Sequence, residues 1–318
     1  MSAATESILY KTAEGVPDTL LRRIWASGRV RVGGGILLAV FLTCVVSLPW
    51  TMSPTSSIYY DGQRNLPQLA KPASGAPAWF GTDLLGRSVL ARCLMGGAIS
   101  MLIGVAAAAI SVVLGLAVGL IAGFKGGWID SSLMRFVDIL YGLPYFLLII
   151  LLKVACEKPL TSLLGNPQAA NLVVLFAAIG LVSWLTMARV VRGQVLSLRG
   201  QPFIEAARAM GLPSTRIFLR HVLPNLVGPV IVYATLIIPQ AILQESFLSF
   251  LGVGINPPLP TWGSLAGEAR EYALNSLNPR WWLLVFPCAM LGVTLLCLNF
   301  LGDGLRDVFD PKREAAKL

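Results

Sequence analysis

Side chains that could carry out catalysis or bind a metal are sparse in this chain. His221 is the one histidine, so neither a histidine-based metal cage nor the H-E-x-x-H pattern of zinc peptidases can be built. The G-x-S-x-G motif, which places a nucleophilic serine on a strained turn, does not occur either. The five cysteines form no CxxC pair, and we expect them to be small hydrophobic residues rather than metal ligands. These patterns argue against an enzyme of these types.

The sequence also offers no site for phosphate chemistry. It contains no G-x-x-x-x-G-K-[ST] motif and no soluble stretch long enough for a nucleotide-binding domain. We therefore expect no catalytic residue, cofactor or metal in this chain. If the protein works with ATP, the nucleotide must bind to another polypeptide, and the loops of this chain must transmit the work mechanically.

Glu245 is an ionisable residue near the outer end of an apolar run. Such a group at membrane depth is costly and usually faces protein or water. Two interpretations follow. Glu245 lines a translocation path or binds amines of the solute, or it satisfies backbone donors where its helix breaks before Gly252 and Gly254.

A short helix followed by a turn is predicted at residues 201–211. Residues 201–210 favour a helix, and Gly211 suits the left-handed position that often ends one. Pro213 opposes continuation, and Ser214 or Thr215 is expected to cap the next helix.

This short helix has an apolar face. Phe203, Ala207 and Met210 fall on one side at helical spacing. Such a face can lie on lipid, pack on its own bundle or dock into a partner. The residues alone leave these three destinations open.

The composition indicates the class of protein in which Glu245 and the short helix at 201–210 are placed. The chain has 318 residues, of which 55% are hydrophobic and 13% charged, whereas a soluble domain carries about 25% charged residues. The mean hydropathy is +0.71. An integral membrane protein is therefore expected. The net charge of +9 is interpreted as basic residues retained in cytoplasmic loops, not as a nucleic-acid surface.

Apolar runs of about 20 residues predict six membrane-spanning helices. They lie at about 32–52, 98–124, 136–156, 169–188, 222–244 (possibly continuing to 251) and 281–301. The third is the weakest, because its uncharged core covers only 139–152; we expect Lys153 to extend to the interface and Arg135 to pair with Asp138. Basic residues are about twice as frequent in the segments that lie inside if both termini are cytoplasmic.

Two further patterns concern packing and the outer loop. Small residues recur every four positions in the second span, which predicts close helix packing rather than a pore lining: Ala107, Ser111, Gly115, Gly119 and Gly123. In the loop before that span, Thr82 or Asp83 is expected to cap a short helix, and Arg87 and Arg92 are interpreted as interfacial charges.

Residues 205–224 carry a resemblance to a known family. Glu205-Ala206-Ala207, three residues, Gly211, nine residues, His221, and then Leu223-Pro224 resemble the EAA loop of ABC importer permeases. His221 stands where most of that family has isoleucine, which is typical of its peptide and nickel branch. Three more segments resemble signatures of that branch in the same order: 81–88, with Ser88 in place of the usual aspartate, 245–254 and 299–311. The likeness covers about 32–311 and is greatest for oligopeptide permeases of the OppC type, then for the dipeptide DppC type.

The resemblance implies an all-α type I ABC importer permease with six spans and a cytoplasmic coupling helix. The residues expected to couple to the ATPase are Phe203, Glu205, Ala206, Ala207, Met210 and Gly211. The implied partners are a second, OppB-like permease subunit, two ATP-binding subunits (OppD- and OppF-like), an external peptide-binding protein, peptide and the lipid bilayer. ATP would be bound by the partners, and the location would be the bacterial inner membrane.

The expected organisation is a cytoplasmic tail (1–31), a first span with an external loop (32–97), a core permease domain (98–301, with the coupling loop at about 199–223) and a second cytoplasmic tail (302–318). Dipeptides, nickel chelates and antimicrobial peptides stay open as substrates. An ion-driven transporter is the alternative from another class; the few membrane carboxylates and the lack of a visible inverted repeat argue against it.

Overall fold

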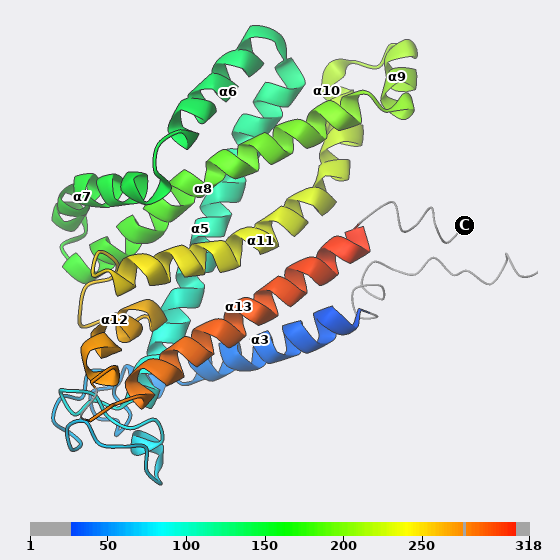
Figure 1. Ribbon diagram of the computed structural model, residues 1–318. Helices are drawn as coiled ribbons and strands as arrows, with labels where there is room; N and C mark the ends of the chain where they lie inside the picture. The colour runs from blue at the N-terminus through cyan, green and yellow to red at the C-terminus, as the bar shows by residue number, and fades with distance from the viewer. Residues whose placement is uncertain (1–26, 276–277, 310–318) are drawn as a thin grey trace, which may run out of the picture.

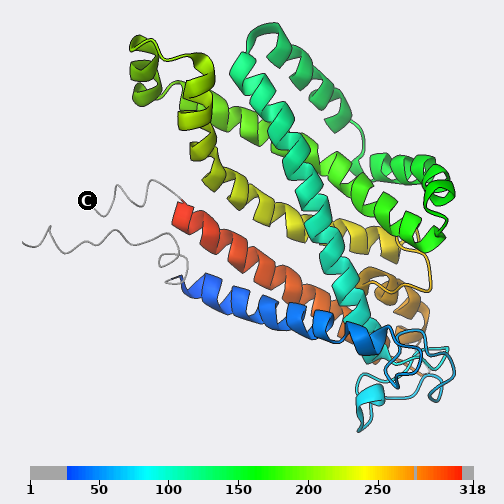
Figure 2. The same cartoon turned by 180° about the vertical axis from the view of Figure 1, so that it is seen from behind.

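Long apolar helices run from one end of the molecule to the other (Figures 1 and 2). The computed structural model describes residues 27–275 and 278–309. Within these ranges five helices are long and apolar enough to cross a membrane, and one bent pair passes the same test together. The predicted all-α membrane fold is thus confirmed. The spanning elements are α3 with α4 (Gly28–Val46, Leu48–Thr51), α5 (Val89–Lys125), α8 (Pro167–Arg199), α11 (Leu223–Phe250) and α13 (Trp282–Phe309).

The predicted third span, 136–156, is not one straight helix. It is divided between α6 (Gly127–Tyr141) and α7 (Tyr145–Leu164), which meet at 91°. Proline accounts for the break, because Pro144 has no N–H and disfavours the helical conformation of the residue before it. Pro144 accordingly lies just before α7 as its N-cap, with a non-helical ψ of 120°.

Lys153 does not extend to an interface as predicted. Its side chain is buried, and its ammonium group donates to the carbonyl oxygens of Val253, at 2.6 Å, and Gly254. Both carbonyls follow the C-terminal end of α11, where the helix dipole favours a cation. Lys153 therefore attaches α7 to the segment after α11.

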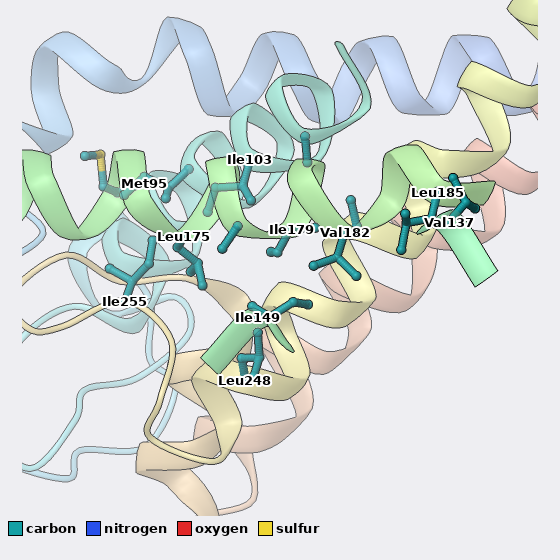
Figure 3. Packing of buried hydrophobic residues seen from close by; sticks show 14 residues of the cluster. Met95, Ile103, Val137, Ile149, Leu175, Ile179, Val182, Leu185, Leu248 and Ile255 are labelled. Atoms are coloured by element: carbon teal, nitrogen blue, oxygen red, sulfur yellow. The ribbon is translucent and has the colours of Figure 1, made fainter. Parts of the chain in front are cut away.

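The largest buried cluster lies along α8. Leu175, Ile179, Val182 and Leu185 form one row on this helix, as Figure 3 shows, and Ile149 from α7 packs in the same cluster. Leu248 brings in α11, and Met95 and Ile103 bring in α5. Helix α8 thus packs against α5, α7 and α11, whereas α3 and α13 pack against each other and against α5, and α13 also packs against α11.

The small residues of α5 pack against α8, as the sequence predicts. A methyl group added at Gly115, Gly119 or Gly123 would lie within 3 Å of atoms on α8. The facing residues are Met187, Ala188, Val191 and Val195. The ladder is therefore a close helix–helix contact and not a pore lining.

Gly119→Ala is expected to destabilise the protein. The new Cβ would lie 2.6 Å from the carbonyl oxygen of Ala188, so the two helices must separate, at a cost of about 1–3 kcal/mol. Gly193→Ala in α8 is the matched control, because nothing lies within 4 Å of that position and alanine favours a helix by up to about 1 kcal/mol. Thermal unfolding in detergent would measure both. Equal midpoints for the two variants would contradict the prediction.

The connecting segments gather at two opposite ends of the molecule (Figures 1 and 2). One end carries α9 (Pro202–Ala209), the start of α3 and the finish of α13. Here Arg29 forms an ion pair with Asp307 at 3.3 Å. The other end carries α12 (Trp262–Ala273) and the irregular segment 53–88, which includes η1 (Ala76–Ala78). Which end faces the cytoplasm stays a prediction.

Candidate functional site

Helix α9 is a small projection at its end of the molecule. It begins after Gln201, and its amphipathic sequence divides its side chains between two sides. Ile204 and Ala207 are buried in a cluster with residues of α8 and α11. Phe203 and Met210 are exposed over 44% and 73% of their surface. Glu205 and Ala206 are exposed as well.

The structure corrects the predicted apolar face. Phe203, Ala207 and Met210 do not form one exposed surface, because Ala207 packs against the bundle beside Ile204. Helical spacing places residues on a common side but does not say how wide the contact with the bundle is. Of the residues expected to couple, Phe203, Glu205 and Ala206 on α9 and Met210 at its C-cap are therefore exposed, as are Pro202, Arg208 and Ala209.

The turn after α9 has the geometry that the sequence predicts. Gly211 is left-handed, with φ of 78°. Its N–H donates to the carbonyl of Arg208 at 2.9 Å, and the N–H of Leu212 donates to that of Ala207 at 3.2 Å. This pair of bonds is the Schellman motif that ends a helix at glycine. No atom lies within 4 Å of a Cβ placed on Gly211, so the need for glycine there is conformational.

The chain then enters α11 without a gap. Pro213, not Ser214 or Thr215, is the N-cap of α10 (Ser214–Ile217), and no side chain caps it. The π-helical segment η2 (Phe218–Val222) follows directly. Within it, the backbone carbonyl of His221 accepts a hydrogen bond of 2.6 Å from the side-chain amide of Asn225. Residues 214–250 thus form one long run from the α9 turn across the molecule.

Ion pairs hold α6 against α8 beside this loop. Arg192 binds Asp130 through two hydrogen bonds of 2.5 and 2.7 Å. Arg189 binds Asp138 at 2.7 Å, so the local pair predicted between Arg135 and Asp138 is replaced by a contact between helices. Arg189 also lies over the ring of Tyr141. A guanidinium suits this place because it combines a charge with a flat face.

At the opposite end, a buried ionic cluster joins segment 53–88 and the start of α5 to α12. Arg92 contacts Asp83 at 2.9 Å and Glu268 at 2.6 Å, and Arg87 binds Asp83 at 2.7 Å. The interpretation of the two arginines as interfacial charges is therefore wrong. Asp83 does not cap a helix either; Ser88 caps α5, accepting from the N–H of Ala91.

Glu245 is fully buried within this chain. Its carboxylate accepts hydrogen bonds from the hydroxyl of Ser249 at 2.6 Å and from that of Ser100, on α5, at 3.2 Å. The sequence suggested backbone donors in a structural role, and the structure provides hydroxyls instead. This placement supports the structural interpretation, in which Glu245 joins α11 to α5; a place on the translocation path stays untested.

A second polar group at membrane depth escaped the sequence analysis. The hydroxyl of Tyr145 donates to the side-chain carbonyl of Gln244 at 2.6 Å and lies 2.9 Å from the hydroxyl of Ser183. It lies where α7 begins after the break at Pro144. The available signal was the pair Gln240 and Gln244, one turn apart in an otherwise apolar run.

The sequence is similar to a family of transport proteins and to named members of it. Residues 115–315 match the family described as "Binding-protein-dependent transport system inner membrane component". The chain is 42% identical to the oligopeptide transport system permease protein OppC of Escherichia coli over 92% of this chain and 90% of that protein. It is 40% identical to the dipeptide transport system permease protein DppC of Bacillus subtilis, over 92% and 84%.

A solved structure shows the same fold. The inward-facing MetNI methionine ABC transporter matches with a TM-score of 0.51 at 19% identity, covering 68% of this chain and 96% of that one. The similarity confirms a type I importer permease fold.

Proposed function

The chain belongs to the family of binding-protein-dependent transport system inner membrane components, and from this premise we propose that it is a membrane subunit of an ATP-driven peptide importer. Relatives named as oligopeptide and dipeptide permeases, which match over 92% of the chain, support a peptide as the solute. Half of the translocation path would lie in this chain and half in a homologous permease subunit.

The exposed side of α9 carries the proposal. Phe203 and Met210 are large apolar side chains left exposed on a projection at one end of the molecule. Such groups commonly mark a contact with a partner, and a short amphipathic helix fits a groove. The partner we propose is an ATP-binding subunit, which receives α9 in a groove of its surface.

The structure supports a mechanical route from α9 into the membrane. Ile204 and Ala207 attach α9 to the bundle, and the turn at Gly211 fixes the angle between α9 and α10. Because residues 214–250 are one helical run, a displacement of α9 by ATP hydrolysis in the partner would tilt α11. The coupling residues at the contact would be Phe203, Glu205, Ala206 and Met210, and Gly211 would form the turn. Ala207 would contribute by packing α9 against the bundle.

The orientation of the chain can be tested by labelling. We expect the α9 end in the cytoplasm and the α12 end outside. Single cysteines placed at Ser74 and Ser214, both exposed, in a background without the five native cysteines, should react with an impermeant thiol reagent from opposite sides. Labelling of both from the outside would contradict this orientation.

Reconstitution tests the function itself. The chain would be assembled in proteoliposomes with its homologous permease subunit, two ATP-binding subunits and the external binding protein. We expect a loaded binding protein to stimulate ATP hydrolysis and to drive peptide uptake. Uptake that needs a proton gradient and no ATP would favour an ion-driven transporter. Uptake of a nickel chelate but of no peptide would show that the substrate is a nickel chelate.

A further inference from the structure

A cavity of about 240 Å³ lies at the break between α6 and α7. The end of α6, the start of α7, the middle of α8 and part of α11 surround it. Ser183 is the central residue of α8, so the cavity lies beside the middle of that helix. Irregular backbone at membrane depth is tolerated where it is buried in protein or lines a water-filled cavity. The break at Pro144 lies beside this cavity, whose lining contains polar as well as apolar side chains.

The polar groups around this cavity are all uncharged. No Asp, Glu, Lys or Arg is among its lining residues within the described chain. The polar lining consists of Tyr141, Tyr145, Ser183, Thr186, Gln240 and Gln244. Its walls are completed by leucine, isoleucine and valine side chains, including Val182 and Leu185, which Figure 3 shows on α8.

Several of these groups have hydrogen-bonding capacity left over. The single proton of the Tyr145 hydroxyl goes to the carbonyl of Gln244, so the Ser183 hydroxyl must donate to Tyr145. The –NH2 of Gln244 donates no hydrogen bond to the residues that the structure describes, which leaves two donors available. Gln240 and Thr186 make no side-chain hydrogen bond with the described residues and are exposed. The cavity thus offers both donors and acceptors from neutral groups.

A peptide main chain has the matching chemistry. It presents neutral N–H and C=O groups at regular spacing, whatever its side chains are, and two glutamines with hydroxyls can bond both. A lipid chain would leave these polar groups unpaired, and a charged solute would find no counter-charge among the lining residues, since Arg189 beside Tyr141 is already paired with Asp138. We propose that this cavity is a subsite that binds main-chain amides of the peptide as it crosses, an inference that rests on the proposed function.

Gln240 is the position to test, because it bonds to nothing else in the described chain. Gln240→Leu removes the amide, and Gln240→Glu keeps its shape and adds a charge. Leu243→Ala, on the same helix but outside the cavity lining, is the control. Uptake of Ala-Ala-Ala, Ala-Lys-Ala and Ala-Glu-Ala would be measured in the reconstituted importer, each as a ratio to the unmodified importer, so that selection by the binding protein cancels.

Gln240→Leu should lower kcat/KM for all three peptides by a similar factor of about two to ten, the worth of one neutral hydrogen bond. Gln240→Glu should change kcat/KM differently for the three peptides, with a higher value for Ala-Lys-Ala than for Ala-Glu-Ala. Leu243→Ala should transport all three normally. Unchanged uptake in Gln240→Leu and in a second variant, Thr186→Val, would overturn the subsite.

The same experiment distinguishes failure of the subsite from other reasons for a loss of uptake. Loss of uptake together with loss of co-purification with the second permease subunit would mean that the partner's side chains fill the cavity, and would overturn the proposal. If the unmodified importer takes up no peptide at all, the proposed function fails and the subsite fails with it. Failure of the subsite alone appears as normal peptide uptake in the unmodified importer and in both cavity variants.

Discussion

Gly211→Val is expected to give a permease that inserts and assembles in the membrane but no longer couples peptide to ATP hydrolysis. At φ of 78° a non-glycine residue costs roughly 1–2 kcal/mol, and a β-branched one more. Because open space surrounds this position, the valine meets no clash, and the chain relieves its strain by changing φ. The bonds from Gly211 and Leu212 to the last turn of α9 would then break, and α9 would leave its angle to α10.

The measurements are co-purification of the ATP-binding subunits and peptide-stimulated hydrolysis in proteoliposomes. Gly200→Val is the matched control, since Gly200 lies before the same helix with φ of −88° and its nearest neighbour would be 3.9 Å from a Cβ. Glu205→Lys should act in the same direction as Gly211→Val but more weakly, through charge alone. If Gly211→Val matches the unmodified protein in both co-purification and peptide-stimulated hydrolysis, the coupling role of α9 is contradicted.

Arg92→Met is expected to have the largest effect on stability, through the buried ionic cluster at the α12 end. Arg92 is 2% exposed and bridges Asp83 to Glu268. Removing one partner of a buried pair costs about 3–5 kcal/mol, because a buried charge is left uncompensated. We expect the lower end of that range, since Asp83 keeps Arg87 and Glu268 is partly exposed. Segment 53–88 should then detach from α12.

Thermal unfolding in detergent and limited proteolysis of residues 53–88 would measure this loss. Arg29→Met is the control, because its ion pair with Asp307 is exposed and such pairs contribute about 1 kcal/mol or less. Arg92→Met combined with Glu268→Gln should recover part of the loss, since it removes the carboxylate that has lost its shortest contact and keeps only Arg87, at 3.5 Å. Equal stability of Arg92→Met and Arg29→Met would show that the cluster does not hold the outer loop.

The family and the fold class could be predicted from the sequence because their signals are local. A span needs only a run of apolar residues, and five such runs became helices that begin or end near the predicted positions. The turn at Gly211 was equally predictable, since one residue type determines whether a left-handed conformation is tolerated. The close packing of α5 followed from small residues at helical spacing.

Only the tertiary structure decided which distant groups meet. Arg92 and Glu268 are 176 positions apart, and no local pattern distinguishes a buried bridge from two interfacial charges. Helical spacing put Ala207 beside Met210, but the bundle decided that one is buried and the other exposed. Any proline can kink a helix, whereas the 91° bend and the polar cavity beside it depend on how α7, α8 and α11 pack. Local propensity acts over a few residues, while burial and pairing are properties of the assembled chain. Helix α9 and its turn could therefore be predicted from the sequence, and the surroundings of Glu245 and Gln244 could not.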